Sequence, residues 1–185
     1  MSMQHDDSNL ADRLKSPVWV MRTIIAGLVL GATMFAGVAI FLVQMDQGLP
    51  GNGLDVMVPI AIGYALFALV ASQVVPRIVA ASSRRSIARG TYPSASSGRG
   101  PQMPEGAAGQ LCLVYQTKMI IGAAFLEGAV LFNMIAYLLT GNPISLGTGI
   151  GLIIATLGLL PSSSRVAGWI EDQLHQLADD RAIGN

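Results

Sequence analysis

Four long stretches of this chain carry almost no charge, and they restrict its fold more than any other feature. They cover residues 23–43, 54–75, 119–139 and 144–160. A helix needs about 20 apolar residues to cross roughly 30 Å of hydrocarbon, and all but the last stretch reach that length. Buried helices of a soluble bundle would show a polar face, and membrane strands would alternate apolar with polar residues. The stretches do neither. The sequence therefore predicts an all-α integral membrane bundle of four transmembrane helices.

The composition agrees with a membrane protein. Hydrophobic residues make up 52% of the chain and charged residues 12%, and the mean hydropathy is +0.55. The formal net charge is zero, so nothing indicates nucleic acid as a partner. One cysteine and two histidines, with no clustered spacing, lead us to expect no metal and no cofactor. The polar, acidic first residues lack the basic start of a signal peptide.

The basic residues predict the orientation of the four spans. Lys and Arg accumulate in short cytoplasmic segments. All 11 precede the first stretch, lie between the second and third, or follow the fourth. We therefore expect both termini and the central loop to be cytoplasmic, in a multi-pass protein of a cell inner membrane. The lipid bilayer is then the first expected partner, with membrane proteins or further copies of the chain as possible others.

The remaining segments divide the chain further. Residues 1–17 form a polar cytoplasmic tail, and residues 18–160 form the transmembrane domain. Residues 82–110 interrupt this domain and are rich in Ser, Gly, Pro and Arg, which predicts a flexible cytoplasmic linker. Because nothing after Gln110 breaks a helix, we expect the third span to extend inward as one long helix.

The tail over residues 161–185 predicts a short amphipathic helix. Apolar residues recur at helical spacing, namely Val166, Trp169, Ile170, Leu174 and Leu177. This face can dock on the protein's own cytoplasmic side or on a partner, and the sequence leaves both open.

A basic cluster begins at the inner end of the second span, with Arg77, Arg84, Arg85 and Arg89. Retention of the loop in the cytoplasm is one explanation, and binding of anionic lipid or of a partner is the other.

Small residues four apart predict where the helices pack, because close backbone approach favours association in lipid. The first span offers Gly27 and Gly31, and the fourth offers Gly147 and Gly151. The pattern does not say whether the partner helix belongs to the same chain.

Glu127 is a single carboxylate deep within the third span. An ionised acid at that depth is costly, so the group should be protonated, hydrogen-bonded or in contact with water. Its expected neighbours are Ala124, Gly128 and, from the second span, Tyr64. Three roles stay open: an interhelical hydrogen bond, a proton or ion site, and ligand binding.

The segment TKMIIGAAFLEGAVLFNMIAYLL, residues 117–139, resembles the second helix of the proteolipid c subunit of F-type ATP synthases. There an entry similar to Thr-x-Met-Ile-Ile-Gly leads to an essential carboxylate, a small residue and then an aromatic. The resemblance implies that Glu127 would be the proton-carrying acid, beside Gly128 and Ala129. It covers one helix, and the whole chain is similar to small four-span bacterial membrane proteins.

Two functions follow from these observations. The first is a structural, interaction or regulatory protein with four spans, for which Glu127 would be a hydrogen-bonding group. The second is a proton- or ion-coupled membrane component in which Glu127 changes protonation. We expect no enzyme activity, because the sequence has no nucleophile motif, acid pair or phosphate loop.

Overall fold

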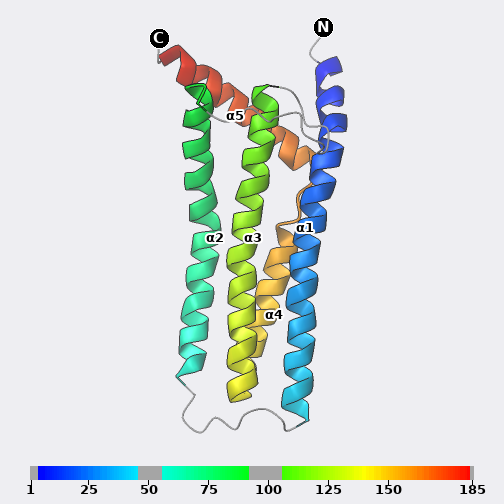
Figure 1. The fold of residues 1–185 in the computed structure, drawn as a ribbon, viewed down its shortest axis with the longest axis vertical. Coiled ribbons are helices and arrows are strands. Elements are labelled where there is room, and N and C mark those ends of the chain that lie inside the picture. The colour runs from blue at the N-terminus through cyan, green and yellow to red at the C-terminus, as the bar shows by residue number, and fades with distance from the viewer. Residues whose placement is uncertain (1–3, 46–55, 92–105, 184–185) are drawn as a thin grey trace. The chain divides into compact units, whose positions relative to one another are not determined.

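The structure is a computed structural model that describes residues 4–45, 56–91 and 106–183, and these ranges form helices and short connections with no strand. Five helices follow one another along the chain (Figure 1). They are α1 (Gln4–Gln44), α2 (Met57–Ala88), α3 (Ala107–Thr140), α4 (Pro143–Gly158) and α5 (Ser163–Ile183). The all-α class predicted from the apolar stretches is confirmed.

Three of these helices are long and apolar enough to cross a membrane, namely α1 from Ser16 onward, α2 and α3. The number rises to four if α4 and α5 are counted together as one broken span. With 16 residues, α4 alone has a length of roughly 24 Å, which is below the usual hydrocarbon thickness. The structure thus supports a multi-pass membrane protein, and a fourth crossing remains a prediction.

The turn between α3 and α4 is well specified by its residues. Gly141 has φ +65°, a conformation that favours glycine at the end of a helix. The side chain of Asn142 then accepts a hydrogen bond from the backbone N–H of Ile144 at 2.9 Å, and Pro143 occupies the first turn. These signals end α3 and start α4 almost immediately, so that only Gly141 and Asn142 connect the two helices.

Three helices extend well beyond the predicted spans, and the first of them, α1, already begins at Gln4. Helix α3 begins at Ala107, as expected for one long helix that enters the third span. Helix α2 continues through Pro76 to Ala88, so the prediction of a flexible linker from residue 82 is wrong for its first turns, and residues 107–110 also belong to a helix. Packing of Ala80 and Ile87 into a hydrophobic core explains the longer α2. The middle of the predicted linker, 92–105, lies outside the described residues.

The chain divides into two compact units. Unit 1 combines residues 1–23, 76–119 and 161–185, and unit 2 combines residues 24–75 and 120–160. The chain changes unit after Thr23, Val75, Met119 and Leu160. Each of these points lies within a residue of an end of an apolar stretch. Unit 2 therefore contains the four apolar stretches, and unit 1 contains the segments that carry most of the charge.

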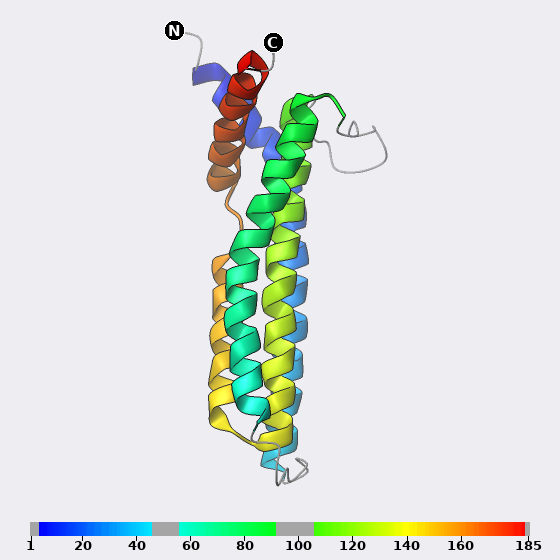
Figure 2. The same cartoon turned by 90° about the vertical axis from the view of Figure 1, so that its left-hand side faces the viewer.

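Unit 2 is a bundle of α1, α2, α3 and α4 around one core (Figures 1 and 2). Alanines supply much of this core on α1 and α2, with Ala61, Ala65 and Ala68 on α2 almost fully buried. Their spacing of four and three residues lines one face of a helix. Larger side chains come from α3, where Leu126, Val130 and Met134 are buried. Small residues on two helices thus accommodate large residues on a third.

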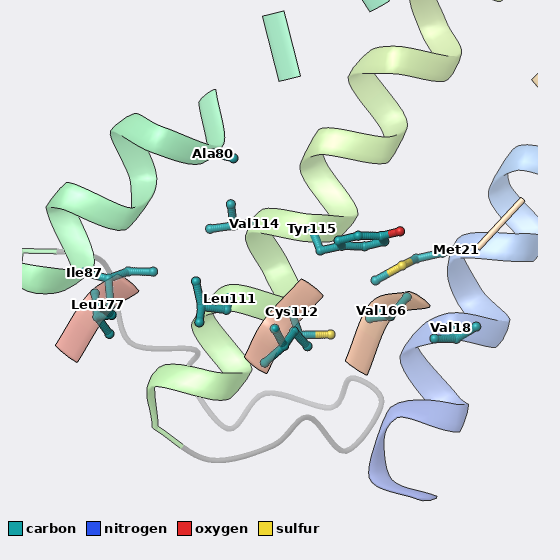
Figure 3. Close-up of a cluster of buried hydrophobic side chains, with 11 residues drawn as sticks. Val18, Met21, Ala80, Ile87, Leu111, Cys112, Val114, Tyr115, Val166 and Leu177 are labelled. Atoms are coloured by element: carbon teal, nitrogen blue, oxygen red, sulfur yellow. The ribbon is translucent and has the colours of Figure 1, made fainter. Parts of the chain in front are cut away.

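Unit 1 has a core of its own, to which α1, α2, α3 and α5 all contribute. Figure 3 shows Met21 of α1 beside Tyr115 of α3, with Val166 of α5 close to both. At the other end of α5, Leu177 packs beside Ile87 of α2 (Figure 3). The apolar face predicted for the tail is therefore buried against the protein's own helices.

Candidate functional site

Glu127 lies on α3 in unit 2, where its side chain is half-buried. Its Oε1 atom is 3.9 Å from the position that a Cβ would occupy on Gly31 of α1. Gly31 had been assigned to helix packing, and the structure instead places it opposite the carboxyl group. The carboxyl group forms no hydrogen bond or ion pair with any residue in the described ranges. An interhelical hydrogen bond within this part of the chain is therefore not the role that the geometry assigns to Glu127.

The other expected neighbours of Glu127 are Tyr64, Gly128 and Ala124, and the structure places them in different surroundings. Tyr64 of α2 has its hydroxyl group 3.4 Å from the Cβ position of Gly128, so this tyrosine reaches the residue directly after Glu127. The ring of Tyr64 also packs edge-on against Phe132, with centroids 5.4 Å apart. Ala124 is exposed on α3. Gly31 thus lies opposite the carboxyl group, and the Tyr64 hydroxyl group lies beside the residue that follows the acid.

A buried polar residue that the sequence reasoning missed is Asn133. It is 0% exposed, and its Nδ2 donates to the carbonyl of Ala61 on α2 at 3.2 Å and to that of Ala129 at 2.8 Å. Its Oδ1 is buried without a hydrogen-bond partner in the described ranges. Asn133 therefore supplies the interhelical hydrogen bond that Glu127 was considered for. Its position one helical turn after Ala129, on the alanine-facing side of α3, was the available signal.

Three of the four glycines predicted to pack helices meet no other helix among the described residues. A Cβ added at Gly27, Gly147 or Gly151 would meet no atom of the described residues within 4 Å, and all three are exposed. The close approach occurs at Gly149, whose Cβ would lie 2.1 Å from Cε of Met134. Alternate glycines of the fourth stretch point to different sides of the helix, and it is the unpredicted one that faces α3. Contact of Gly27, Gly147 or Gly151 with another copy remains a prediction.

The four arginines of the predicted basic cluster have different environments in the structure. Arg84 donates to the side-chain oxygens of Gln173 and Gln176 on α5, which ties α2 to the distant half of that helix. Arg85 and Arg89 are exposed. Arg77 lies close enough to Lys118 of α3 for the two positive charges to repel each other.

Lys118 lies in an aromatic environment. Its Nζ is 5.7 Å from the ring centroid of Tyr115 and 5.4 Å from that of Trp169 on α5. The two rings meet edge-on at 5.1 Å. Cation–π attraction of this kind partly replaces the water that a half-buried ammonium group loses.

Arg22 of α1 holds the connection between α4 and α5. Its Nε donates to the carbonyl of Pro161 at 2.8 Å. The hydroxyl group of Ser162 then accepts a hydrogen bond from the backbone N–H of Arg165, as an N-cap does at the start of α5. The four basic residues Arg22, Arg77, Lys118 and Arg165 thus come from four different helices, and each lies within a few residues of a point where the chain changes unit.

Comparison with known proteins gives no further guide to this site: no family model, no curated protein and no solved structure matches the chain.

Proposed function

We propose that the chain is a structural or regulatory protein with four transmembrane spans in a bacterial inner membrane, and that it engages its partners through a module on the cytoplasmic side. Unit 2 would lie in the bilayer, and unit 1 would be the cytoplasmic module. The one-sided distribution of all 11 basic residues supports this orientation. The change of unit at the ends of the apolar stretches supports the division into a membrane part and a module outside it.

The observation that carries the proposal is the separate core of unit 1. Val166 and Ile170 of α5 are 0% exposed, although α5 is the least apolar of the five helices. A helix that only adsorbs to lipid would leave its apolar face free of protein contacts. Here α5 instead forms a folded surface with the ends of three long helices, and it presents exposed polar residues such as Asp172 and His175. A rigid polar surface outside the bilayer is suited to binding another protein.

Photocrosslinking in intact cells tests this proposal. A crosslinking amino acid is placed at Asp172 or His175 on α5, and at Leu66 on the exposed face of α2 as the matched control. We expect a discrete protein adduct from α5 and only lipid adducts from Leu66. A protein adduct from neither α5 position would refute the interaction role. Adducts with soluble proteins from Leu66 would refute the membrane placement of unit 2.

Proton or ion coupling through Glu127 is the second candidate. It is favoured by the half-buried carboxyl group beside Gly31, which has no hydrogen bond to a described residue. A carboxyl group without a fixed partner is free to exchange a proton or to bind a cation. The helix resembling the proteolipid c subunit agrees with this candidate.

Labelling with a hydrophobic carbodiimide in native membranes tests this second candidate, because the reagent needs a protonated carboxyl group that it can reach from the hydrocarbon. Proton exchange predicts labelling of Glu127 that decreases as pH rises, and no labelling in Glu127→Gln. Absence of labelling at every pH would show that the group is enclosed. In that case the first proposal would stand alone.

A further inference from the structure

Four basic residues of unit 1 lie near the start of α5 or near a residue that contacts it, and none of them pairs with an acid whose side chain the structure describes. Arg22, Arg77 and Lys118 come from α1, α2 and α3, and Arg165 comes from the first turn of α5. Within the described ranges, none of the four forms an ion pair. The nearest described acids along α5, Glu171 and Asp172, are exposed and lie more than one helical turn beyond Arg165.

The contacts around Lys118 and Arg22 show how this group is held. The rings of Tyr115 and Trp169 lie on Lys118, and Arg165 is near enough to Tyr115 to act on it electrostatically. Arg22 uses its Nε for the carbonyl of Pro161. The terminal guanidinium nitrogens of Arg22 stay available, because they form no bond to a described residue.

Like charges held near one another repel, and partial burial of Lys118 increases that cost. An anion bound between these basic side chains would offset their mutual repulsion. A phosphate group suits this position, because guanidinium groups bind phosphate oxygens through paired N–H donors and an ammonium group adds a compact positive charge. Trp169 supplies the amphipathic ring that is common where a protein meets the headgroup layer.

We infer that Arg22, Arg77, Lys118 and Arg165 form a binding site for the phosphate group of an anionic phospholipid. The inference rests on the proposed membrane placement of unit 2, which would bring these residues to the headgroup layer. It assigns the lipid contact to these four residues and not to Arg85 and Arg89, which lie further along the chain at the end of α2. Each basic residue near an anionic surface contributes about 1 kcal/mol, which corresponds to about fivefold in affinity.

Native mass spectrometry of the full chain in a neutral detergent measures this binding. The chain is titrated with dioleoyl phosphatidylglycerol and, separately, with dioleoyl phosphatidylcholine at constant ionic strength. The test variant is Lys118→Gln with Arg165→Gln, and the matched control is Arg85→Gln with Arg89→Gln. Both remove two charges from unit 1. Arg22 is kept, because its hydrogen bond to Pro161 has a structural role.

We expect the chain to retain phosphatidylglycerol at least tenfold better than phosphatidylcholine. The test variant should lose about 25-fold in affinity for phosphatidylglycerol, and the control should lose less than about twofold. Arg165 is exposed, so Arg165→Gln alone should fold normally and should lose about fivefold.

Three results would overturn the inference. Equal losses in the test and control variants would mean that the basic residues act only through diffuse charge. Equal retention of the two lipids would mean that the headgroup phosphate and its charge are not recognised. Displacement of phosphatidylglycerol by inorganic phosphate at equal concentration would show a site for a free anion. Because the binding is measured in detergent, it does not depend on the membrane placement, which the crosslinks from Leu66 test separately.

Discussion

Gly149 of α4 lies directly against Met134 of α3, and a methyl group there should destabilise unit 2. The Cβ of Gly149→Ala would lie 2.1 Å from Cε of Met134, so one of the two groups must move. Met134 is 0% exposed and belongs to the core of unit 2, which leaves its side chain little room. Overpacking of a well-filled core costs about 1 to 3 kcal/mol. The control is Gly147→Ala, whose Cβ meets nothing within 4 Å and should change stability by less than about 0.5 kcal/mol.

A double-mutant cycle tests the cause of that loss. Met134→Ala alone leaves a cavity and costs about 2 to 5 kcal/mol. In the double variant the new methyl group at position 149 enters the space left by Met134. The double variant should therefore be less destabilised than the sum of the single variants, by about 1 to 3 kcal/mol. Unfolding by SDS in mixed micelles, followed by helical circular dichroism, measures each variant. Additive effects, or equal tolerance of Gly149→Ala and Gly147→Ala, would refute this account of the contact between α3 and α4.

Three further predictions concern other buried groups. Ile170→Ala should make unit 1 susceptible to limited proteolysis, because truncation of a buried Ile to Ala lowers the free energy of unfolding by about 2 to 5 kcal/mol. Asp172→Ala, at an exposed position, should leave cleavage unchanged, and equal cleavage of the two variants would contradict the packing of α5. Cys112 is 0% exposed and should react with a maleimide only after denaturation, whereas Ser82→Cys on the exposed side of α2 should react at once; rapid labelling of Cys112 in the native chain would contradict the core of unit 1. Asn133→Leu should lower the free energy of unfolding in the SDS assay by less than about 1.7 kcal/mol, because it removes an interhelical hydrogen bond but also a buried acceptor without a partner. Asn133→Asp should lower the free energy of unfolding more, because a carboxyl group in place of the amide cannot donate to both carbonyls. The reverse order would contradict the assigned hydrogen bonds.

The apolar stretches were sufficient to predict the helical class and the helix ends beside the two short loops. They did not predict how far α1, α2 and α3 continue beyond the apolar stretches at their other ends, because hydrocarbon thickness sets only the length of the apolar part. The sequence also predicted the apolar face of α5, since Val166 and Ile170 keep helical spacing and are buried. The surface that α5 packs against could not be predicted, because a periodic apolar face shows that a helix packs but does not identify its partner.

The residues of the candidate site were harder to predict. Depth along the helix singled out Glu127, but the rotation of α3 decides which neighbour it meets, and that rotation depends on all four helices of unit 2. Asn133 was underestimated for the same reason: only the structure shows that it faces Ala61 of α2. Among the glycines of the fourth stretch, Gly149 is distinguished from Gly147 and Gly151 only by the direction in which it points.

The core of unit 1 also has a consequence for the order of biosynthesis. Its members range from Val18 on α1 to Leu177 on α5, which follows every other helix in the chain. Contacts between segments so far apart in sequence form late, because the chain between them must first be made and positioned. The four apolar stretches all precede α5 and are therefore made before it. The core of unit 1 can close only after α5 has been made, so until then Met21, Leu111 and Tyr115 lack their partners from α5.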